Sequence, residues 1–368
     1  MKTESPVRSL SEVTAEWLTE CLNSHPLYQG AVVKSLARKP CNYVATSGSL
    51  YRIMPVYEDH QSGRLPASFI LKLPSMHTDR SSYRSYYRRE RKFYYEMAVS
   101  VESLVPRCIH SAWDEEDGSF HLLLEDCQLY GYAPNWSVGP PKDELRLSVI
   151  WLAKFHAAWW GMDPDPDFAP LQDDDSRFSD DRYFDEMWSR FDGCLDRRDR
   201  DICEQIFRHW KQLVVSQAER PKTLCHGDFH PNNIFLPHGG KGYPKVIDWQ
   251  FCHVGIGVSD VADLMTLYVH PHLRKSCELE IIRTYWETLI QEGVENYSLE
   301  DCVTDYVIET CKNVLMPFFQ LSISNLPLSA AVQCMRNVLL SFEDLIERRN
   351  NDLHEILGSI KISWPYVS

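Results

Sequence analysis

The sequence predicts a two-lobed α+β protein in which a smaller strand-rich part is followed by a larger, mainly helical part. Apolar strand-like segments fall in the first third of the chain, at 32–53, 68–73 and 120–126, whereas stripes of apolar residues with helical spacing dominate the remainder. The chain has 368 residues, 12% of them aromatic, which is enough to bury a substantial core. We place the boundary before the Gly- and Pro-containing segment that follows the last of these strands, giving lobes at 1–126 and 127–368.

The composition indicates which cellular compartment and which classes of partner suit the protein. There are 38 Lys and Arg residues against 52 Asp and Glu residues, and the resulting net charge of −14 argues against nucleic acid or an anionic membrane as the main partner. The 12 cysteines are scattered without a Cys-x-x-Cys pair, a pattern that favours a reducing compartment. No apolar signal core opens the chain, and no apolar run approaches the length of a membrane span. We therefore expect a cytoplasmic protein without membrane insertion.

The start of the first lobe contains a short helix and a polar turn. A short helix is expected from Thr14 to Leu22, with Thr14 as its cap. The polar turn at 42–49 then separates two strand-like pieces and contains one glycine, Gly48. Such a turn suits a loop that covers nucleotide phosphates with backbone N–H groups, but the residues alone favour an ordinary hairpin at least as much.

A lysine and a glutamate in the first lobe each need a partner. Lys72 interrupts the apolar strand at 68–73, where a charge is costly unless it is paired or reaches the surface. Glu90 lies inside the apolar stripe of a helix expected at 83–101. The alternative is a surface lysine and a peripheral glutamate, but the joint pattern predicts an ion pair. In kinases, such a pair holds the α- and β-phosphates.

The most informative segment is 224–236, followed by 245–250, because it places three polar side chains among short apolar runs. A strand-loop-strand unit of this kind can bring Asp228, Asn233 and Asp248 into one small space. Asp228 would then be a base or hydroxyl-orienting group, and Asn233 and Asp248 would be hard oxygen ligands for magnesium. Phosphoryl transfer needs this division of roles. Two other readings stay open for such residues: turn chemistry, and a metal cluster built on a His-x-Asp-x-His sequence.

The spacing His226-x-Asp228-x-x-x-x-Asn233, with Asp248 following, resembles the catalytic loop and metal-binding aspartate of the kinase-like superfamily. The surrounding residues resemble its small-molecule branch, which holds aminoglycoside phosphotransferases, choline kinases and ecdysteroid-kinase-like proteins. Segments that look like the ecdysteroid-kinase-like group are Glu90-Arg-Lys-Phe-Tyr94, the acid-ended strand at 120–126 and Leu152-Ala-Lys-Phe-His-Ala-Ala-Trp-Trp160. The resemblance implies a bilobal protein-kinase-like fold, ATP and Mg²⁺ as cofactors, and a small-molecule acceptor.

The resemblance also assigns roles to single residues. The Glu125 carbonyl and the Cys127 N–H would meet the adenine edge, and the turn that contains Ser47 and Gly48 would cover the phosphates. In the second lobe, the resemblance makes Asp263 the acid that buttresses the catalytic loop. It also makes His156 a buried structural histidine rather than a catalyst.

Several residues distinguish the chain from a protein kinase. Gly227 replaces the arginine of the H-R-D sequence, and Trp249-Gln250 replaces Phe-Gly after the metal-binding aspartate. The interval from Asp248 to Asp260 is too short for a peptide-binding activation segment. These differences indicate a constitutively assembled enzyme that acts on a small molecule.

In the second lobe, helices are expected at 143–160 and 201–217, and three amphipathic helices follow from Glu278 onward. The resemblance suggests that these last helices wall the acceptor pocket. The acid-rich segment at 163–186 indicates a solvated loop rather than a cation-binding lid.

The predicted function is transfer of the γ-phosphate of ATP to a hydroxyl group of a small molecule. The candidate acceptors are an ecdysteroid-like alcohol, an amino alcohol and an aminoglycoside-like sugar. Two functions from other classes remain as alternatives. One is a catalytically silent kinase fold that acts as a binding module. The other is a metal-dependent hydrolase that uses His226, Asp228 and His230.

Overall fold

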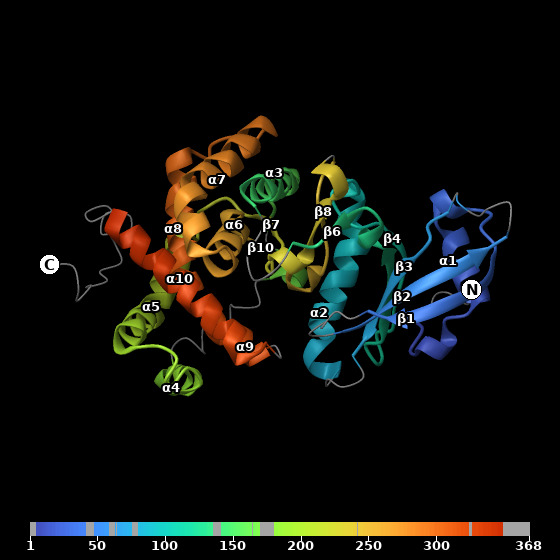
Figure 1. The fold of residues 1–368 in the computed structure, drawn as a ribbon, viewed down its shortest axis with the longest axis horizontal. Helices are drawn as coiled ribbons and strands as arrows, with labels where there is room; N and C mark the ends of the chain where they lie inside the picture. Colours follow the sequence, from blue (N-terminus) through green and yellow to red (C-terminus); the bar gives the residue numbers. More distant parts are fainter. Residues whose placement is uncertain are drawn as a thin grey trace. The chain divides into compact units, whose positions relative to one another are not determined.

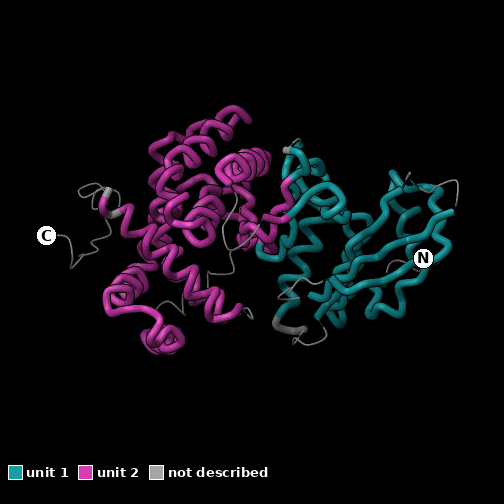
Figure 2. Tube along the Cα trace, in the orientation of Figure 1, with its two compact units in different colours: residues 1–132, 237–251 teal, residues 133–236, 252–368 magenta. Residues whose placement is uncertain are grey.

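The computed structural model describes residues 5–41, 48–58, 63, 65–75, 80–134, 141–163, 165–169, 180–240, 242–323 and 326–348. The chain divides into two compact units (Figure 2). The first comprises Met1–Tyr132 and Pro237–Phe251, and the second comprises Ala133–Leu236 and Cys252–Ser368. The chain first passes from one unit to the other after Tyr132, six residues beyond the expected boundary at 126. The later segment Pro237–Phe251 returns to the first unit.

The returning segment belongs to the first unit because of the contacts that it makes there. Lys245 Nζ donates to the Val105 carbonyl at 2.9 Å and forms an ion pair with Glu125 at 3.0 Å. Trp249 stacks on Phe93 with ring centroids 3.9 Å apart. Such long-range contacts cannot be read from the order of strands and helices along the chain.

The first unit is built on a five-stranded antiparallel sheet with the strand order β1-β2-β3-β5-β4. The strands are β1 (Val33–Pro40), β2 (Gly48–Tyr57), β3 (Phe69–Pro74), β4 (Cys108–Trp113) and β5 (Phe120–Glu125). Helix α1 (Ala15–Ser24) packs against this sheet (Figure 1), and the Thr14 side chain caps it by accepting from Trp17 N. The expected helix and the three strand segments are therefore confirmed.

Helix α2 (Arg80–Lys92) supplies the second wall of this unit. The helix continues without a break as a π-helical turn, Phe93–Met97, and a 3₁₀ turn, Ala98–Val101. Its Tyr87 is fully buried and stacks on Phe120 of β5 at 4.4 Å. This apolar stripe presses α2 onto the sheet and directs Glu90, three residues further on, inward as well. The remaining short elements of the unit are Leu10–Glu12, Pro26–Tyr28, Cys127–Leu129, β6 (Gly131–Tyr132), His238–Gly240, β9 (Lys245–Val246) and Trp249–Phe251.

The second unit is mainly helical. Its helices are α3 (Lys142–Ala158), α4 (Asp181–Ser189), α5 (Arg197–Ser216), α6 (Val258–Asp263), α7 (Pro271–Gln291), α8 (Leu299–Asn313), α9 (Met316–Ile323) and α10 (Leu328–Arg348), with 3₁₀ turns at Pro166–Phe168 and Pro231–Asn233 and a π-helical turn at Leu264–Tyr268. Strand β7 (Thr223–Cys225) pairs antiparallel with β10 (His253–Gly255), and β8 (Ile234–Pro237) follows the catalytic-loop sequence. All five expected helices form. None of the helices described is long and apolar enough to cross a membrane.

The acid-rich segment differs from the expectation where the structure describes it. The solvated loop was expected to run to residue 186, but α4 already begins at Asp181, after Asp180 accepts from Arg182 N. Phe184 and Trp188 of this helix are buried against α5 and Phe318. These apolar side chains have the spacing of one helical face, and their burial outweighs the acidic composition.

Candidate functional site

Three charged side chains of the first unit meet in one buried cluster. Strand β3 supplies Lys72, helix α2 supplies Glu90, and Asp248 follows β9. The Lys72 Nζ atom lies 2.7 Å from Glu90 Oε2 and 2.7 Å from Asp248 Oδ1. The Lys72 side chain is 5% exposed and that of Glu90 only 1%. The predicted ion pair between the strand and the helix is therefore formed.

The pKa values of Lys72 and Glu90 are set by burial and by the charges beside them. Burial by itself lowers the pKa of Lys72, but the carboxylates of Asp248 and Glu90 outweigh this effect and raise it. The pKa of Glu90 is raised chiefly by burial, while the Lys72 charge and the Trp249 N–H act in the opposite direction. Lys72 therefore stays cationic because two carboxylates face it.

Of the predicted phosphate loop at 42–49, the structure describes Gly48 and Ser49, at the start of β2, and Ser47 lies outside the described residues. Gly48 pairs with Pro74 of β3 and stands against the Lys72 side chain. A Cβ atom at Gly48 would lie 3.1 Å from both Lys72 Cε and the Leu73 carbonyl oxygen. A glycine at this position therefore leaves room for the lysine to reach its partners.

Gly48→Val is expected to weaken Mg·ATP binding by roughly tenfold, because a branched side chain displaces the Lys72 side chain from its two carboxylates. Titration calorimetry measures this change. Ser49→Val is the matched control, since the next residue of a strand points to the opposite face of the sheet. Equal losses in the two variants would show that the strand, and not the space beside Lys72, was disturbed.

Asp248 is held in a backbone conformation that L-residues rarely adopt, with φ of 67°. The next residue, Trp249, is fully buried, stacks nearly parallel on Phe93, and donates from Nε1 to the Val246 carbonyl at 2.9 Å. Such a conformation persists only when the surroundings enforce it. The buried indole therefore fixes the direction of the Asp248 carboxylate.

The second unit carries the other predicted residues on the loop after β7. Asn233 Nδ2 donates to the Asp228 carbonyl at 3.0 Å and approaches Asp228 Oδ2 at 3.3 Å, which turns the other amide atom, Oδ1, away from these contacts. Burial raises the pKa of Asp228, but the nearby His230 and His226 and the Asn233 amide outweigh burial and lower it. Asp228 is therefore ionised at neutral pH and can accept a proton or a hydrogen bond.

The predicted catalytic loop is anchored by Asp260, not by Asp263 as expected. Asp260 Oδ2 accepts from His226 N at 2.6 Å and Oδ1 accepts from Gly227 N at 2.9 Å, while His156 Nε2 lies 3.1 Å from Oδ2. Asp263 lies one turn further along and meets the Asn313 amide instead. Both acids occur in the segment Ser259-Asp-Val-Ala-Asp263, and only the helix orientation decides which one faces the loop. His156 is fully buried and hydrogen-bonded to Tyr285 at 2.8 Å, as expected.

The chain matches the ecdysteroid kinase-like family over residues 42–295. It belongs to the ecdysteroid kinase-like family. Its fold is that of protein-kinase-like small-molecule kinases. Among similar structures are a choline kinase from Cryptosporidium parvum Iowa II (TM-score 0.58, 12% identity, covering 93% of this chain and 99% of that one) and a microcompartment-associated aminopropanol kinase (0.55, 14%, 94% and 98%). A third is an aminoglycoside 2′-phosphotransferase-IIIa in complex with GDP (0.51, 12%, 90% and 99%). No curated protein matches the chain.

Family membership confirms the expected bilobal α+β fold and makes the chain a small-molecule phosphotransferase. The structure does not favour the alternative hydrolase site. His226 is fully buried, and its Nδ1 accepts from Asp228 N. Within the described part of the chain, three His, Cys, Asp or Glu side chains come close enough to share one metal ion at His156, Cys225 and Asp260. The histidine and aspartate atoms of this group already make the hydrogen bonds that anchor the catalytic loop, so we interpret it as a structural network.

The predicted adenine-contacting residues lie where β5 ends, with Glu125 closing the strand and Cys127 opening a 3₁₀ turn. The sequence did not indicate the role of Asp126 between them. This carboxylate is 2% exposed and accepts from Arg52 Nε at 2.6 Å, from Ser68 Oγ at 2.7 Å and from Gln128 N at 3.1 Å. Asp126 therefore fixes the backbone of this connection. The acid-ended strand was the only signal for it.

Proposed function

We propose that this member of the ecdysteroid kinase-like family transfers the γ-phosphate of ATP to a hydroxyl group of a small molecule, with magnesium as the metal ion. The observation that carries the proposal is the buried cluster in which Lys72 Nζ lies 2.7 Å from both Glu90 and Asp248. In kinases, a lysine paired with a helix glutamate binds the nucleotide phosphates, and an aspartate nearby binds the metal ion. Lys72, Glu90 and Asp248 match these three residues.

The donor atoms fit magnesium. Mg²⁺ prefers oxygen ligands, and one or two carboxylates usually hold it together with phosphates and water. Asp248 offers a carboxylate on a fixed backbone, and Asn233 offers the Oδ1 that its amide contacts leave available. We assign these two residues to the metal. When bound, the ion neutralises charge on the transferring phosphoryl group.

The remaining residues take the roles that their chemistry allows. Lys72, held by Glu90, faces the phosphates, Gly48 and Ser47 belong to the loop over them, and Glu125 and Cys127 provide backbone contacts for the adenine. Asp228 accepts the proton of the acceptor hydroxyl. The new bond forms between that oxygen and the γ-phosphorus, while the bond to the bridging oxygen breaks and ADP leaves with the electron pair.

Acceptors within this proposal are an ecdysteroid-like alcohol, an amino alcohol and an aminoglycoside-like sugar. The family description and the names of the similar kinases support a small hydroxylated molecule as the class. We expect ATP-dependent phosphorylation in a screen of such compounds, measured by ADP release. Phosphate release without an acceptor would instead indicate a hydrolase.

Asp248→Ala is expected to abolish stabilisation by Mg·ATP, because a nucleotide that binds the native state raises its stability by mass action. At a hundredfold excess over Kd, wild type gains about 2.7 kcal/mol, seen as a rise in Tm of several degrees. Magnesium alone and zinc alone are measured in parallel. If Mg·ATP does nothing while zinc stabilises the protein, the kinase proposal fails.

A further inference from the structure

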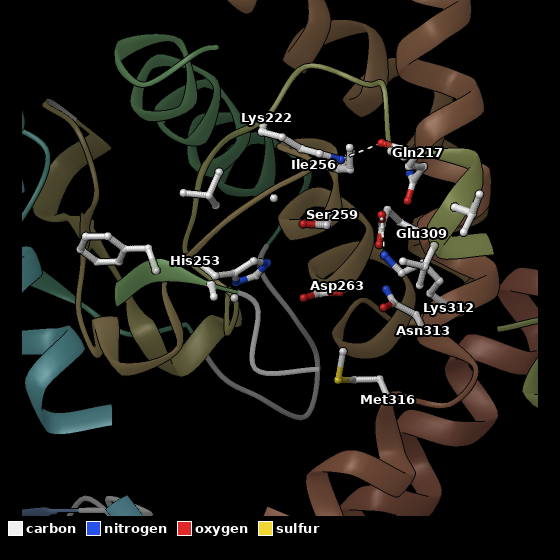
Figure 3. Close-up of a pocket in the computed structure, with 18 of the residues that line it drawn as sticks. Gln217, Lys222, His253, Ile256, Ser259, Asp263, Glu309, Lys312, Asn313 and Met316 are labelled. Atoms are coloured by element: carbon white, nitrogen blue, oxygen red, sulfur yellow. Dashed lines mark hydrogen bonds and ion pairs between the residues drawn. The ribbon is translucent and has the colours of Figure 1, made fainter. Parts of the chain in front are cut away.

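The second unit contains a pocket of about 550 Å³ beside the catalytic loop (Figure 3). Its wall includes Gly227, the residue before Asp228, and residues of α5, α6 and α8. This volume falls within the range of sites for drug-sized ligands and exceeds what a very small amino alcohol requires. Trp210, Phe168, Ile256 and Met316 form its apolar surface.

Two ionisable groups in this wall are already paired. Lys312 Nζ lies 3.0 Å from Glu309 Oε1, and both side chains are mostly buried. The pair balances its own charge and leaves none for a ligand. The other ionisable side chains of the wall are partly buried: Asp165, which caps its own 3₁₀ turn, His253, Asp263 and Lys222.

Asp263 is a partly buried carboxyl without a cationic partner. Its side chain meets the Asn313 amide, and no ion pair joins it to any of the residues that the structure describes. Burial raises its pKa well above the ordinary value, and the charges of Asp260, Glu309 and Asp228 add to this effect. Asp263 lines the same pocket as Gly227, the residue before Asp228 in the chain. A ligand cation beside Asp263 would relieve the cost of its ionisation.

The other end of the pocket offers donors. Lys222 Nζ donates to the Gln217 carbonyl at 2.7 Å, and its pKa is lowered by burial and by Lys312. The Gln217 side chain is 2% exposed, and neither of its polar atoms makes a hydrogen bond with the described residues, although its amide lowers the pKa of Asp305. In Figure 3, Lys222 and Gln217 lie at the upper end of the pocket, and Asp263 lies below them, nearer its middle.

We propose that this pocket binds the acceptor, and that the acceptor is an amphipathic amino alcohol with an anionic group at its far end. Its ammonium group, next to the hydroxyl, pairs with Asp263. Its apolar body lies along Trp210 and Ile256, and its anionic group accepts from Lys222 and Gln217. This inference rests on the proposed function, because it places the reacting hydroxyl near Asp228.

Three matched probes test the assignment: 2-amino-3-(4-carboxyphenyl)propan-1-ol, the diol in which a hydroxyl replaces its amine, and the amino alcohol without the carboxylate. For wild type, kcat/KM for the first probe should exceed that for the diol by roughly tenfold or more, as expected for one charge pair in a pocket. Asp263→Asn should reduce this ratio to about twofold or less. Lys222→Met should remove the preference for the carboxylate.

Asp165→Asn is the matched control, because it removes a carboxylate from the wall of the same pocket while an asparagine can still accept from Asp167 N. It should leave the amine preference intact. Equal kcat/KM values for the amine and the diol in wild type would overturn the inference, as would an equal loss of preference in Asp165→Asn and Asp263→Asn.

The folding of the test variant can be checked from its pH dependence. A raised pKa means that Asp263 keeps its proton in the native state at a pH where the unfolded chain has released it. The free energy of unfolding therefore falls as the pH rises above the ordinary pKa of an aspartate. Asp263→Asn removes this loss, and its Tm at pH 7.5 should be no lower than that of wild type. A lower Tm would show that Asp263 carries a stabilising charge, contrary to the inference.

Binding and turnover separate the two proposals. If Mg·ATP stabilises the protein and the diol is phosphorylated as well as the amine, the kinase proposal stands and the pocket assignment fails. If Mg·ATP has no effect, the kinase proposal fails. A rise in Tm with the first probe alone, lost in Asp263→Asn, would then still support the amine site. No rise with that probe would overturn it.

Discussion

Asp228→Asn is expected to lower kcat by roughly 10²–10⁴-fold, the contribution typical of a positioned general base. The Asp228 pKa lies below its ordinary value because the nearby histidines and the Asn233 amide outweigh burial, so the wild-type carboxylate is ionised and ready to accept the hydroxyl proton. An amide of the same shape cannot accept that proton. Single-turnover kinetics with Mg·ATP and an acceptor that the wild-type enzyme phosphorylates measure the loss directly.

The same substitution should leave the affinity for Mg·ATP within about twofold, because the metal and phosphate contacts are assigned to Asp248, Asn233 and Lys72. Thermal shift with Mg·ATP checks this. Asp192→Asn, at an exposed carboxylate of the same unit, is the control for the loss of one negative charge. Wild-type turnover in Asp228→Asn would remove this residue from the mechanism.

Asp260→Ala is expected to destabilise the protein by roughly 2–6 kcal/mol, because it leaves the buried N–H of His226 and the partly buried N–H of Gly227 without their acceptor, at about 1–3 kcal/mol each. The loop that carries Asp228 would lose its anchor, so kcat should fall as well. Denaturant unfolding measures the stability, and the midpoint is compared at constant slope.

The matched control is Asp263→Ala, one helical turn further along, which leaves the two loop N–H groups bonded. A smaller stability loss in this variant than in Asp260→Ala distinguishes the two acids, and the reverse order would restore Asp263 as the anchor. The pH dependence gives a second check. Burial raises the pKa of Asp260, but His156 and His226 outweigh burial and lower it. Its contribution to stability is therefore present above pH 3.8 and lost as the pH falls through the lower native value.

The local sequence pattern was sufficient to predict most of the fold and the Lys72–Glu90 ion pair. The buried lysine in an apolar strand and the glutamate in an apolar helical stripe each required a partner, and Lys72 and Glu90 do meet. The capped helix after Thr14 follows from the same kind of local chemistry. In each case a single residue would be unfavourable in its expected surroundings without the contact that the structure provides.

Other features depend on residues far apart in the sequence. The segment 237–251 belongs to the first unit because Trp249 stacks on Phe93 and Lys245 pairs with Glu125. Each of these contacts joins residues more than a hundred positions apart in the sequence. The helix α4 forms within an acidic segment because α5 and Phe318 cover its apolar face. Composition alone indicated a solvated loop there.

The sequence by itself determined the class of the protein, the order of its strands and helices, the ion pair in the first unit and the placement of Asp228 and Asn233 on one loop. These follow from local periodicity and from spacings within a few residues. Only the tertiary structure decided that Asp260, and not Asp263, holds the loop, and that Asp263 faces a pocket with Lys222 and Gln217. The physical reason is that two acids three residues apart share one helical face. The packing of α6 against its neighbours sets which of them meets the backbone and which meets the cavity.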